Sequence, residues 1–143
     1  MMERALLDPA RPEDQHIAER LRNNLIVWLT TVRPDGRPHM AAVWFLWEGA
    51  TILIFSQPNQ KVRNLRANPS VALALDGSDT GDDVITIEGQ AELLPASAVT
   101  PEYQPYAAKY AAKYAEMQWS SADMAQAYSQ AIRITPTRFR TVS

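Results

Sequence analysis

The chain has 143 residues with a formal net charge of −2 at pH 7, and this length is typical of one domain that buries a core without disulfides. It contains no cysteine, which excludes disulfides, thiolate zinc sites, iron–sulfur clusters and a cysteine nucleophile. The balanced charge does not indicate a dedicated nucleic-acid-binding protein. The longest apolar run, residues 41–47, is far shorter than the roughly 20 residues of a membrane-spanning helix, so we expect a cytoplasmic protein without a membrane partner.

The first half of the chain predicts a helix followed by three strands. Residues 1–12 are expected to form an N-terminal arm of a single domain over 1–143. Apolar residues spaced three and four apart predict a helix over 12–23. Pro34-Asp35-Gly36 is a typical turn sequence. Runs of β-branched and aromatic residues predict strands on both sides of this turn and beyond it, over 25–32, 40–47 and 51–56.

The second half predicts three more strands and three helices. A short helix over 61–67 ends at Asn68-Pro69. Gly89 indicates a β-bulge or a close backbone approach inside its strand. The other predicted elements are strands over 71–75, 84–94 and 131–140, the last broken at Pro136, and helices over 106–114 and 120–128. Six strands with mostly short connections predict a mainly β fold with α-helices, in which an antiparallel sheet closes into a small barrel.

Three cations at the start of the short helix are the most informative cluster. Lys61, Arg63 and Arg66 lie within six residues, directly after a loop, together with Asn64. A helix N-terminus offers free N–H groups and a partial positive charge, which attract phosphate. The alternative interpretation of such a run is a solvated basic face.

Aromatic residues concentrate on the first two predicted strands. Strand alternation places Trp44 on one face and both Phe45 and Trp47 on the other, with Trp28 on the neighbouring strand. One face is expected to line the core, and the other to cover a planar ring or a second subunit. For each residue the alternative is a place in the core. Three tyrosines spaced four apart, at 106, 110 and 114, are expected to form a helix face that packs on the barrel.

No motif indicates a built-in catalytic set. His39 has no acid or serine at a recognisable spacing, and we interpret it as structural. The acidic loop 76–83 lacks the alternate spacing and late glutamate of a calcium loop. The Walker, G-x-G-x-x-G, H-E-x-x-H and G-x-S-x-G motifs are absent. No catalytic residue and no metal site is therefore predicted, and in an enzyme of this sequence a bound cofactor would carry the reaction.

Five segments, read together, resemble the pyridoxamine 5′-phosphate oxidase-like superfamily. They are most similar to its branch that uses the 5-deazaflavin coenzyme F-420. The segments are 29–39, 43–45, 61–73, 88–91 and 134–138. The resemblance covers most of the chain from about residue 24. It implies a six-stranded antiparallel split β-barrel, a homodimer, and two cofactor sites in the grooves between the subunits.

The resemblance also implies which residues hold the cofactor. The loop and helix over 56–64 are expected to bind its phosphate, the strand 42–44 to run beside its ring, and the loop 76–78 to lie nearby. Two further residues are expected from the partner subunit. The full expected set is Ala42, Val43, Trp44, Ser56, Gln57, Lys61, Arg63, Asn64, Asp76, Gly77 and Ser78, with Trp119 and Arg138 from the partner.

The implied function is an oxidoreductase in which reduced F-420 passes a hydride to a small unsaturated or quinone-like organic substrate. The C-terminus, 138–143, lacks the arginine- and histidine-bearing substrate motif of the oxidase that names the superfamily, so we do not expect pyridoxamine phosphate oxidation. F-420 and FMN both carry a phosphate on a ribityl chain, and the basic cluster suits either. Arg33 and Arg37 are candidate contacts for the acidic tail of F-420. The alternatives are an FMN-binding oxidoreductase or flavin reductase, and a non-catalytic carrier of flavin or haem.

Overall fold

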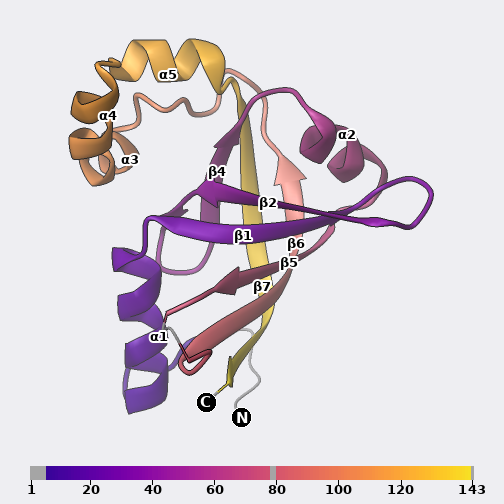
Figure 1. The fold of residues 1–143 in the computed structure, drawn as a ribbon, viewed down its shortest axis with the longest axis vertical. Helices are drawn as coiled ribbons and strands as arrows, with labels where there is room; N and C mark the ends of the chain where they lie inside the picture. Colours follow the sequence, from indigo (N-terminus) through magenta and orange to yellow (C-terminus); the bar gives the residue numbers. More distant parts are fainter. Residues whose placement is uncertain (1–5, 78–79, 143) are drawn as a thin grey trace.

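The computed structural model describes residues 6–77 and 80–142, which form five helices and seven strands (Figure 1). In chain order the elements are α1 (Pro12–Asn23), β1 (Ile26–Val32), β2 (Pro38–Trp44), β3 (Leu46–Trp47), β4 (Ile52–Ser56), α2 (Gln60–Ala67), β5 (Ser70–Leu75), β6 (Val84–Leu93), α3 (Gln104–Lys109), α4 (Ala111–Met117), α5 (Ser121–Ala127) and β7 (Gln130–Val142). No helix within the described part of the chain is long and apolar enough to cross a membrane.

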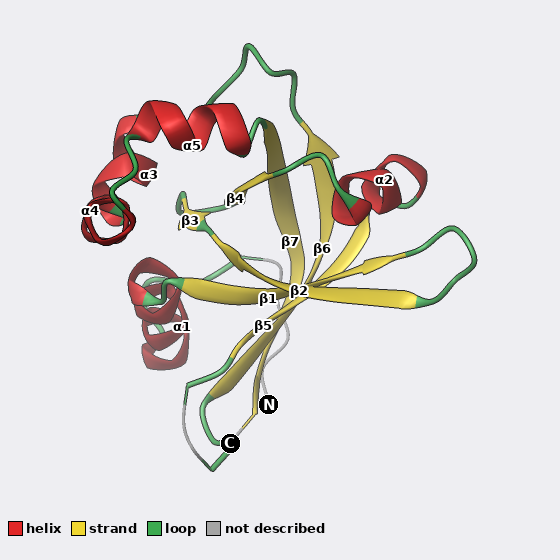
Figure 2. Ribbon diagram, turned by 45° about the horizontal axis from the view of Figure 1, so that its top comes forward, coloured by secondary structure: helices red, strands yellow, loops and turns green. Residues whose placement is uncertain are grey.

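One antiparallel sheet in the order β2-β1-β5-β6-β7-β4-β3 contains all of these strands. The sheet curls into a half-barrel, with the helices placed around it (Figure 2). Alternate side chains of each strand point to the concave side and form the main core, where Leu29, Phe45 and Phe139 are fully buried. Ile17 and Leu21 of α1 close this core at one end. The predicted antiparallel split-barrel fold with packed helices is therefore confirmed.

The predicted number of six strands is wrong, because the strand expected over 40–47 is two strands. β2 pairs with β1 as far as Trp44, whereas β3 pairs with β4. Between them, Phe45 donates its backbone N–H to the Tyr110 hydroxyl at 2.8 Å, and its carbonyl accepts from the Lys109 ammonium at 2.8 Å. Side chains thus satisfy backbone groups that a continuous strand would have paired with a neighbouring strand.

Gly89 lies at a β-bulge, as predicted. The pairing of β6 with β7 shifts after Glu88, which faces Arg138, while Gly89 faces Pro136. The expected break at Pro136 is wrong, because β7 continues through it. A bulge tolerates a proline, which has no N–H for the ladder, and so the strand bends without ending.

The segment between β6 and β7 folds into the helices α3, α4 and α5, which lie together beside β4 (Figure 1). The single helix predicted over 106–114 is interrupted at Tyr110, whose backbone leaves the helical conformation at ψ 13°. The tyrosine stripe is nevertheless buried, as predicted, in a second apolar cluster outside the main core. Ser120 caps α5, since its hydroxyl accepts from the Asp123 N–H at 3.1 Å and its own N–H donates to the Asp123 carboxylate at 2.8 Å.

Candidate functional site

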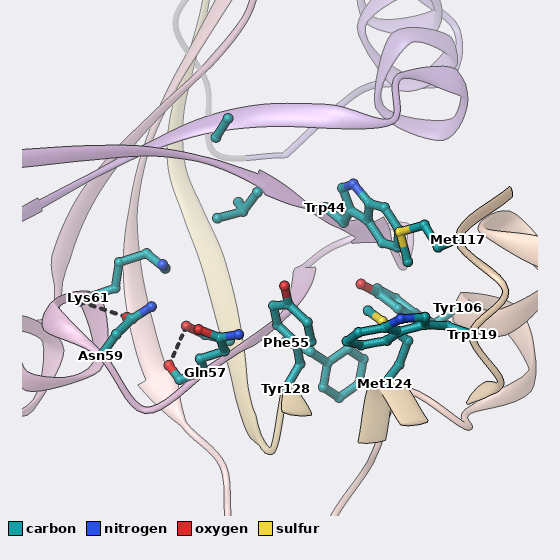
Figure 3. A pocket seen from close by; sticks show the side chains of 13 residues that line it. Trp44, Phe55, Gln57, Asn59, Lys61, Tyr106, Met117, Trp119, Met124 and Tyr128 are labelled. Carbon is teal, nitrogen blue, oxygen red and sulfur yellow. Dashed lines mark hydrogen bonds between the residues drawn. The ribbon is translucent and has the colours of Figure 1, made fainter. Parts of the chain in front are cut away.

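A cleft of about 470 Å³ lies on the convex side of the sheet, between β2, β4 and the helices α3–α5. This volume is in the range of small-molecule and cofactor sites. Figure 3 shows that the cleft has two chemically different ends. The polar end is defined here as Ser56, Gln57, Asn59 and Lys61, and the aromatic end as Trp44, Phe55, Tyr106, Met117, Trp119, Met124 and Tyr128. Ala42 and Val43 complete the lining.

The polar end is built where β4 passes into α2. Asn59 caps the helix, because its side-chain oxygen accepts from the Lys61 backbone N–H at 3.2 Å. The buried Ser56 hydroxyl donates to the carbonyl of Gln57 at 2.7 Å and so fixes the loop. The first turn of α2 contains no acidic residue, and therefore its positive end is not neutralised from within the helix.

Lys61 places an unpaired cation at this end of the cleft. Within the described residues its ammonium group has no hydrogen-bond or ion-pair partner, and its side chain lines the cleft (Figure 3). Burial lowers the pKa of Lys61. The pKa of nearby His39 is lowered as well, first by desolvation and then by the charges of Arg33 and Lys61. A partly desolvated cation beside a helix N-terminus is a fitting site for a phosphate or another anion.

The aromatic end is held in shape by ring packing. Trp44 stacks on Tyr110 with ring centroids 4.5 Å apart and planes 3° from parallel. Phe55 meets Tyr106 edge to face at 4.7 Å. Met117 and Trp119 flank Gln118, which has a left-handed backbone at φ 57°, and both remain about two-fifths exposed at the cleft. The result is a hydrophobic wall that fits a planar ring.

The Tyr110 hydroxyl links the aromatic end to the backbone at the end of β2 through hydrogen bonds. It accepts the Phe45 N–H at 2.8 Å, and its one proton has two acceptors in reach, the carbonyl oxygens of Leu25 at 2.7 Å and Phe45 at 2.9 Å. Burial raises the pKa of Tyr110, so the hydroxyl stays protonated at neutral pH. Burial also lowers the pKa of Lys109, whose ammonium binds the same Phe45 carbonyl, to about 8.

Six of the thirteen residues expected from sequence line the cleft on the chain where they were expected: Ala42, Val43, Trp44, Ser56, Gln57 and Lys61. Trp119, which was expected from the partner subunit, lines the cleft of its own chain. Arg63 is exposed on α2 and donates to Gln60 at 3.0 Å. Asn64 is fully buried beneath the helix, where its amide donates to the Thr31 hydroxyl at 2.9 Å and so fixes α2 on β1. Neither residue lines the cleft.

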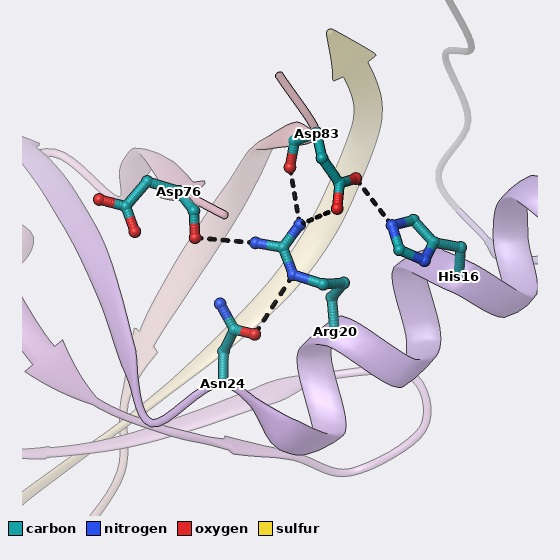
Figure 4. A network of polar contacts seen from close by, with 5 residues as sticks. All are labelled: His16, Arg20, Asn24, Asp76 and Asp83. Carbon is teal, nitrogen blue, oxygen red and sulfur yellow. Dashed lines mark hydrogen bonds and ion pairs between the residues drawn. The ribbon is translucent and has the colours of Figure 1, made fainter. Parts of the chain in front are cut away.

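The loop after β5 does not line the cleft either, because it is attached to α1 (Figure 4). The Arg20 guanidinium donates to the carbonyl oxygens of Asp76 at 2.8 Å and Asp83 at 2.6 Å, and Asp83 also pairs with His16 at 2.7 Å. Gly77 packs on Arg20 so closely that an added Cβ would lie 2.6 Å from its nitrogens. Ser78 lies outside the described residues.

Arg138 lies on the convex face of the sheet and pairs with Glu88 at 3.5 Å. Directly paired residues of antiparallel strands share a face. The register therefore places Arg138 on the same face as Met40 and Trp28, which are 63% and 41% exposed. Ala42 and Trp44 of the cleft belong to this face too. The cleft is thus continuous with a sheet face that is apolar and exposed on β1 and β2 and charged on β6 and β7.

Sequence reasoning missed six lining residues: Phe55, Asn59, Tyr106, Met117, Met124 and Tyr128. Asn59 had a detectable signal, since an asparagine directly before a helix is a typical N-cap. Tyr106 was assigned to helix packing alone. Phe55 belongs to the predicted strand 51–56, where every residue is apolar apart from its ends, so alternation gave no sign of which face opens to the cleft. Met117, Met124 and Tyr128 come from the helical segment, whose path over β4 is set by tertiary packing, and no local pattern reveals which of its side chains face the cleft.

Comparisons with known proteins agree with the fold and with the resemblance found in the sequence. A solved F-420 reductase is 28% identical with a TM-score of 0.64, over 85% of this chain and 94% of that one. A conserved hypothetical protein from Mycobacterium tuberculosis is 26% identical with a TM-score of 0.68, over 89% and 82%. The haem storage protein of Vibrio cholerae shares the fold at 18% identity and a TM-score of 0.67, over 95% and 94%. The family model for pyridoxamine 5′-phosphate oxidase matches residues 13–143, and the chain therefore belongs to that family.

Proposed function

We propose that this protein is an oxidoreductase that binds coenzyme F-420 and uses it to transfer a hydride to a small unsaturated or quinone-like organic substrate. One observation carries the proposal: a partly desolvated cation, Lys61, stands at a helix N-terminus at one end of a cleft whose other end is aromatic. A phosphate and a planar ring on one molecule match these two ends. The similarity to an F-420 reductase at 28% identity supports F-420 over other ring cofactors.

In this proposal the polar end binds the phosphate. Lys61 supplies a charged hydrogen bond, and the free N–H groups of the first turn of α2 add to it. Arg63, exposed on the same helix, contributes charge at longer range. Asn64 acts as a positioning residue, because its bond to Thr31 holds the helix on the sheet.

The ring is held beside the strand segment Ala42, Val43 and Trp44, where the aromatic end begins. When bound, the deazaflavin ring supplies the hydride. The chain itself orients the ring against a wall that Tyr110 keeps in place, and its aromatic side chains exclude water from the reacting face. No side chain is assigned the role of acid or base, and solvent is the proposed source of the proton.

The proposal includes a homodimer. Trp28 and Met40 are exposed apolar residues on the convex sheet face, and the register places Ala42 and Trp44 of the cleft on the same face. Exposed apolar patches of this kind mark interaction sites. A second copy placed on it would cover Trp28, bring its own residues to the open side of the cleft, and make Arg138 available to the neighbouring site.

An FMN-dependent oxidoreductase is the second candidate, since FMN offers the same phosphate and a similar ring to the same two ends. Absorbance distinguishes the two cofactors, because bound flavin and bound deazaflavin have different bands. Haem is the third ligand to compare. Among the described residues, the lining contains no histidine that would serve as an axial ligand.

The test is equilibrium binding of F-420, FMN and haem, measured side by side. We expect F-420 to bind most tightly. Lys61→Ala should weaken F-420 binding by about 1.5–3 kcal/mol, the usual loss for a charged hydrogen bond, which is roughly tenfold to a hundredfold in affinity. Adding Arg63→Ala should weaken binding further, by a smaller factor.

Arg66→Ala is the matched control, because Arg66 is an exposed cation on the same helix that does not line the cleft. Arg66→Ala should keep the affinity for F-420 within about twofold of that of the unmodified protein. Equal affinity of Lys61→Ala and the unmodified protein would contradict the assignment of the polar end. Tighter binding of FMN than of F-420 would replace the proposed cofactor by the second candidate.

A further inference from the structure

The three tyrosines of the helical segment, at 106, 110 and 114, have hydroxyl groups in three different environments. The Tyr110 hydroxyl is engaged with the backbone of Phe45 and Leu25. The Tyr114 hydroxyl is fully covered and has no hydrogen-bond partner within the described residues. The Tyr106 hydroxyl also lacks a partner there, but unlike that of Tyr114 it is not sealed, and the residue lines the cleft. Only Tyr106 of the three therefore offers a free hydroxyl to a ligand.

The surroundings of Tyr106 fix the position of its ring and keep its hydroxyl protonated, so that it can donate a hydrogen bond. The residue is 1% exposed, and its ring is held between Phe55 at 4.7 Å and Tyr110 at 5.0 Å. Burial raises the pKa of Tyr106, with smaller contributions from the neighbouring tyrosines, so the hydroxyl keeps its proton throughout the physiological range. A buried, protonated hydroxyl with no internal partner is costly unless something else accepts its hydrogen bond.

Tyr128, at the end of α5, supplies a second hydroxyl. It also lines the cleft and makes no side-chain hydrogen bond within the described part of the chain. Figure 3 shows the hydroxyl oxygens of Tyr106 and Tyr128 on the side of the cleft that faces Trp44. Among the described lining residues the only charged side chain is Lys61, at the opposite end. The aromatic end thus combines apolar walls with two neutral donors.

We propose that Tyr106, together with Tyr128, donates a hydrogen bond to a carbonyl oxygen of the second reactant, and that the aromatic end selects uncharged, planar, carbonyl-bearing compounds. This inference rests on the proposed function, in that the second reactant shares the cleft with the cofactor. The walls provide stacking for a flat apolar molecule. The hydroxyls discriminate in favour of a carbonyl group, because an analogue without it leaves them unpaired. A carboxylate is disfavoured at this end, where it would lose its hydration with no cation to compensate.

The probe is menadione, an uncharged naphthoquinone, and 2-methylnaphthalene is its carbonyl-free analogue. The protein has no cysteine, and so menadione forms no thiol adduct. The full chain is saturated with oxidised F-420, which carries no hydride to transfer, and each probe is titrated by the quenching of tryptophan fluorescence. The carbonyl stretch of isotopically labelled menadione is recorded by infrared difference spectroscopy, and binding should move it to lower frequency.

Tyr106→Phe should weaken menadione binding about three- to tenfold, the net worth of one neutral hydrogen bond, and should reverse most of the infrared shift. The affinity for 2-methylnaphthalene should not change. Tyr114→Phe is the matched control, since it removes a hydroxyl that faces no cleft, and it should leave both titrations and the infrared shift as they are.

Three results would overturn the inference: equal menadione affinity in Tyr106→Phe, an equal loss for both probes, or a loss of F-420 binding without a loss of menadione binding. The proposed function fails in a different way. If F-420 does not bind the unmodified protein, the proposed function is contradicted. The same titrations of the protein without F-420 still report whether Tyr106 binds the carbonyl oxygen of menadione.

Discussion

Trp44 faces the cleft because Tyr110 fixes both its ring and the backbone beside it. The two rings stack at 4.5 Å, and the Tyr110 hydroxyl takes up the N–H of the next residue, Phe45. The same contact ends β2 and allows the chain to pair with β4 afterwards. One side chain thus determines where a strand stops and how the ring wall of the cleft is oriented.

Tyr110→Phe should lower the free energy of unfolding by about 1–3 kcal/mol, because the buried Phe45 N–H loses its acceptor. Urea denaturation measures this loss. Tyr106→Phe is the control, since its hydroxyl has no partner within the described residues and its removal should cost close to nothing. Equal stability of the two variants would contradict the role given to Tyr110.

At the scale of single residues, local chemistry predicted part of the site. Lys61 was predicted as a site residue because it is a cation that follows a loop at the start of a helix, and it lines the cleft. Strand alternation predicted that Trp44 and Phe45 lie on opposite faces, and the structure places them in different clusters. Arg63 shares the first of these local patterns but projects to solvent. Sequence spacing alone does not distinguish the two cations, because the direction of each depends on how α2 docks on β1.

At the scale of elements, the strands and the helix starts were predictable because their signals are local. α1 spans the predicted 12–23, and α5 lies within the predicted 120–128, with Ser120 as its N-cap. The errors concern where elements are interrupted. A predicted strand is divided at Phe45, a predicted helix is divided at Tyr110, and a predicted strand break at Pro136 does not occur. In each case tertiary contacts decide the outcome: side chains cap a strand end, a helix bends to bury its tyrosines, and a bulge accommodates a proline.

Gly89→Ala should destabilise the junction of β6 and β7 by about 1–3 kcal/mol, the usual cost of forcing an extra group into a packed site. Its Cβ would lie 2.8 Å from the Thr135 carbonyl oxygen, a backbone atom that cannot turn away. Gln90→Ala is the neighbouring control at an exposed position. Thermal unfolding followed by circular dichroism measures both. An unchanged midpoint for Gly89→Ala would show that the bulge relaxes to admit a methyl group.

At the scale of the whole molecule, the exposed face with Trp28 and the cleft are one continuous surface, and the proposed dimer follows from that continuity. Trp28→Glu should convert a dimer into a monomer and weaken F-420 binding at the same time, because the open side of the cleft loses its cover. Light scattering after size-exclusion chromatography reports the mass. Leu6→Glu, at an exposed apolar residue that belongs to no strand, should stay dimeric. An unmodified protein that is monomeric at high concentration would refute the dimer.

The most direct test of the account is a crystal structure of the protein with oxidised F-420. We expect the phosphate of the coenzyme within hydrogen-bond distance of the Lys61 ammonium and the first turn of α2, and the deazaflavin ring beside the strand segment 42–44. A coenzyme bound elsewhere on the surface, or a phosphate that leaves Lys61 facing water, would contradict it.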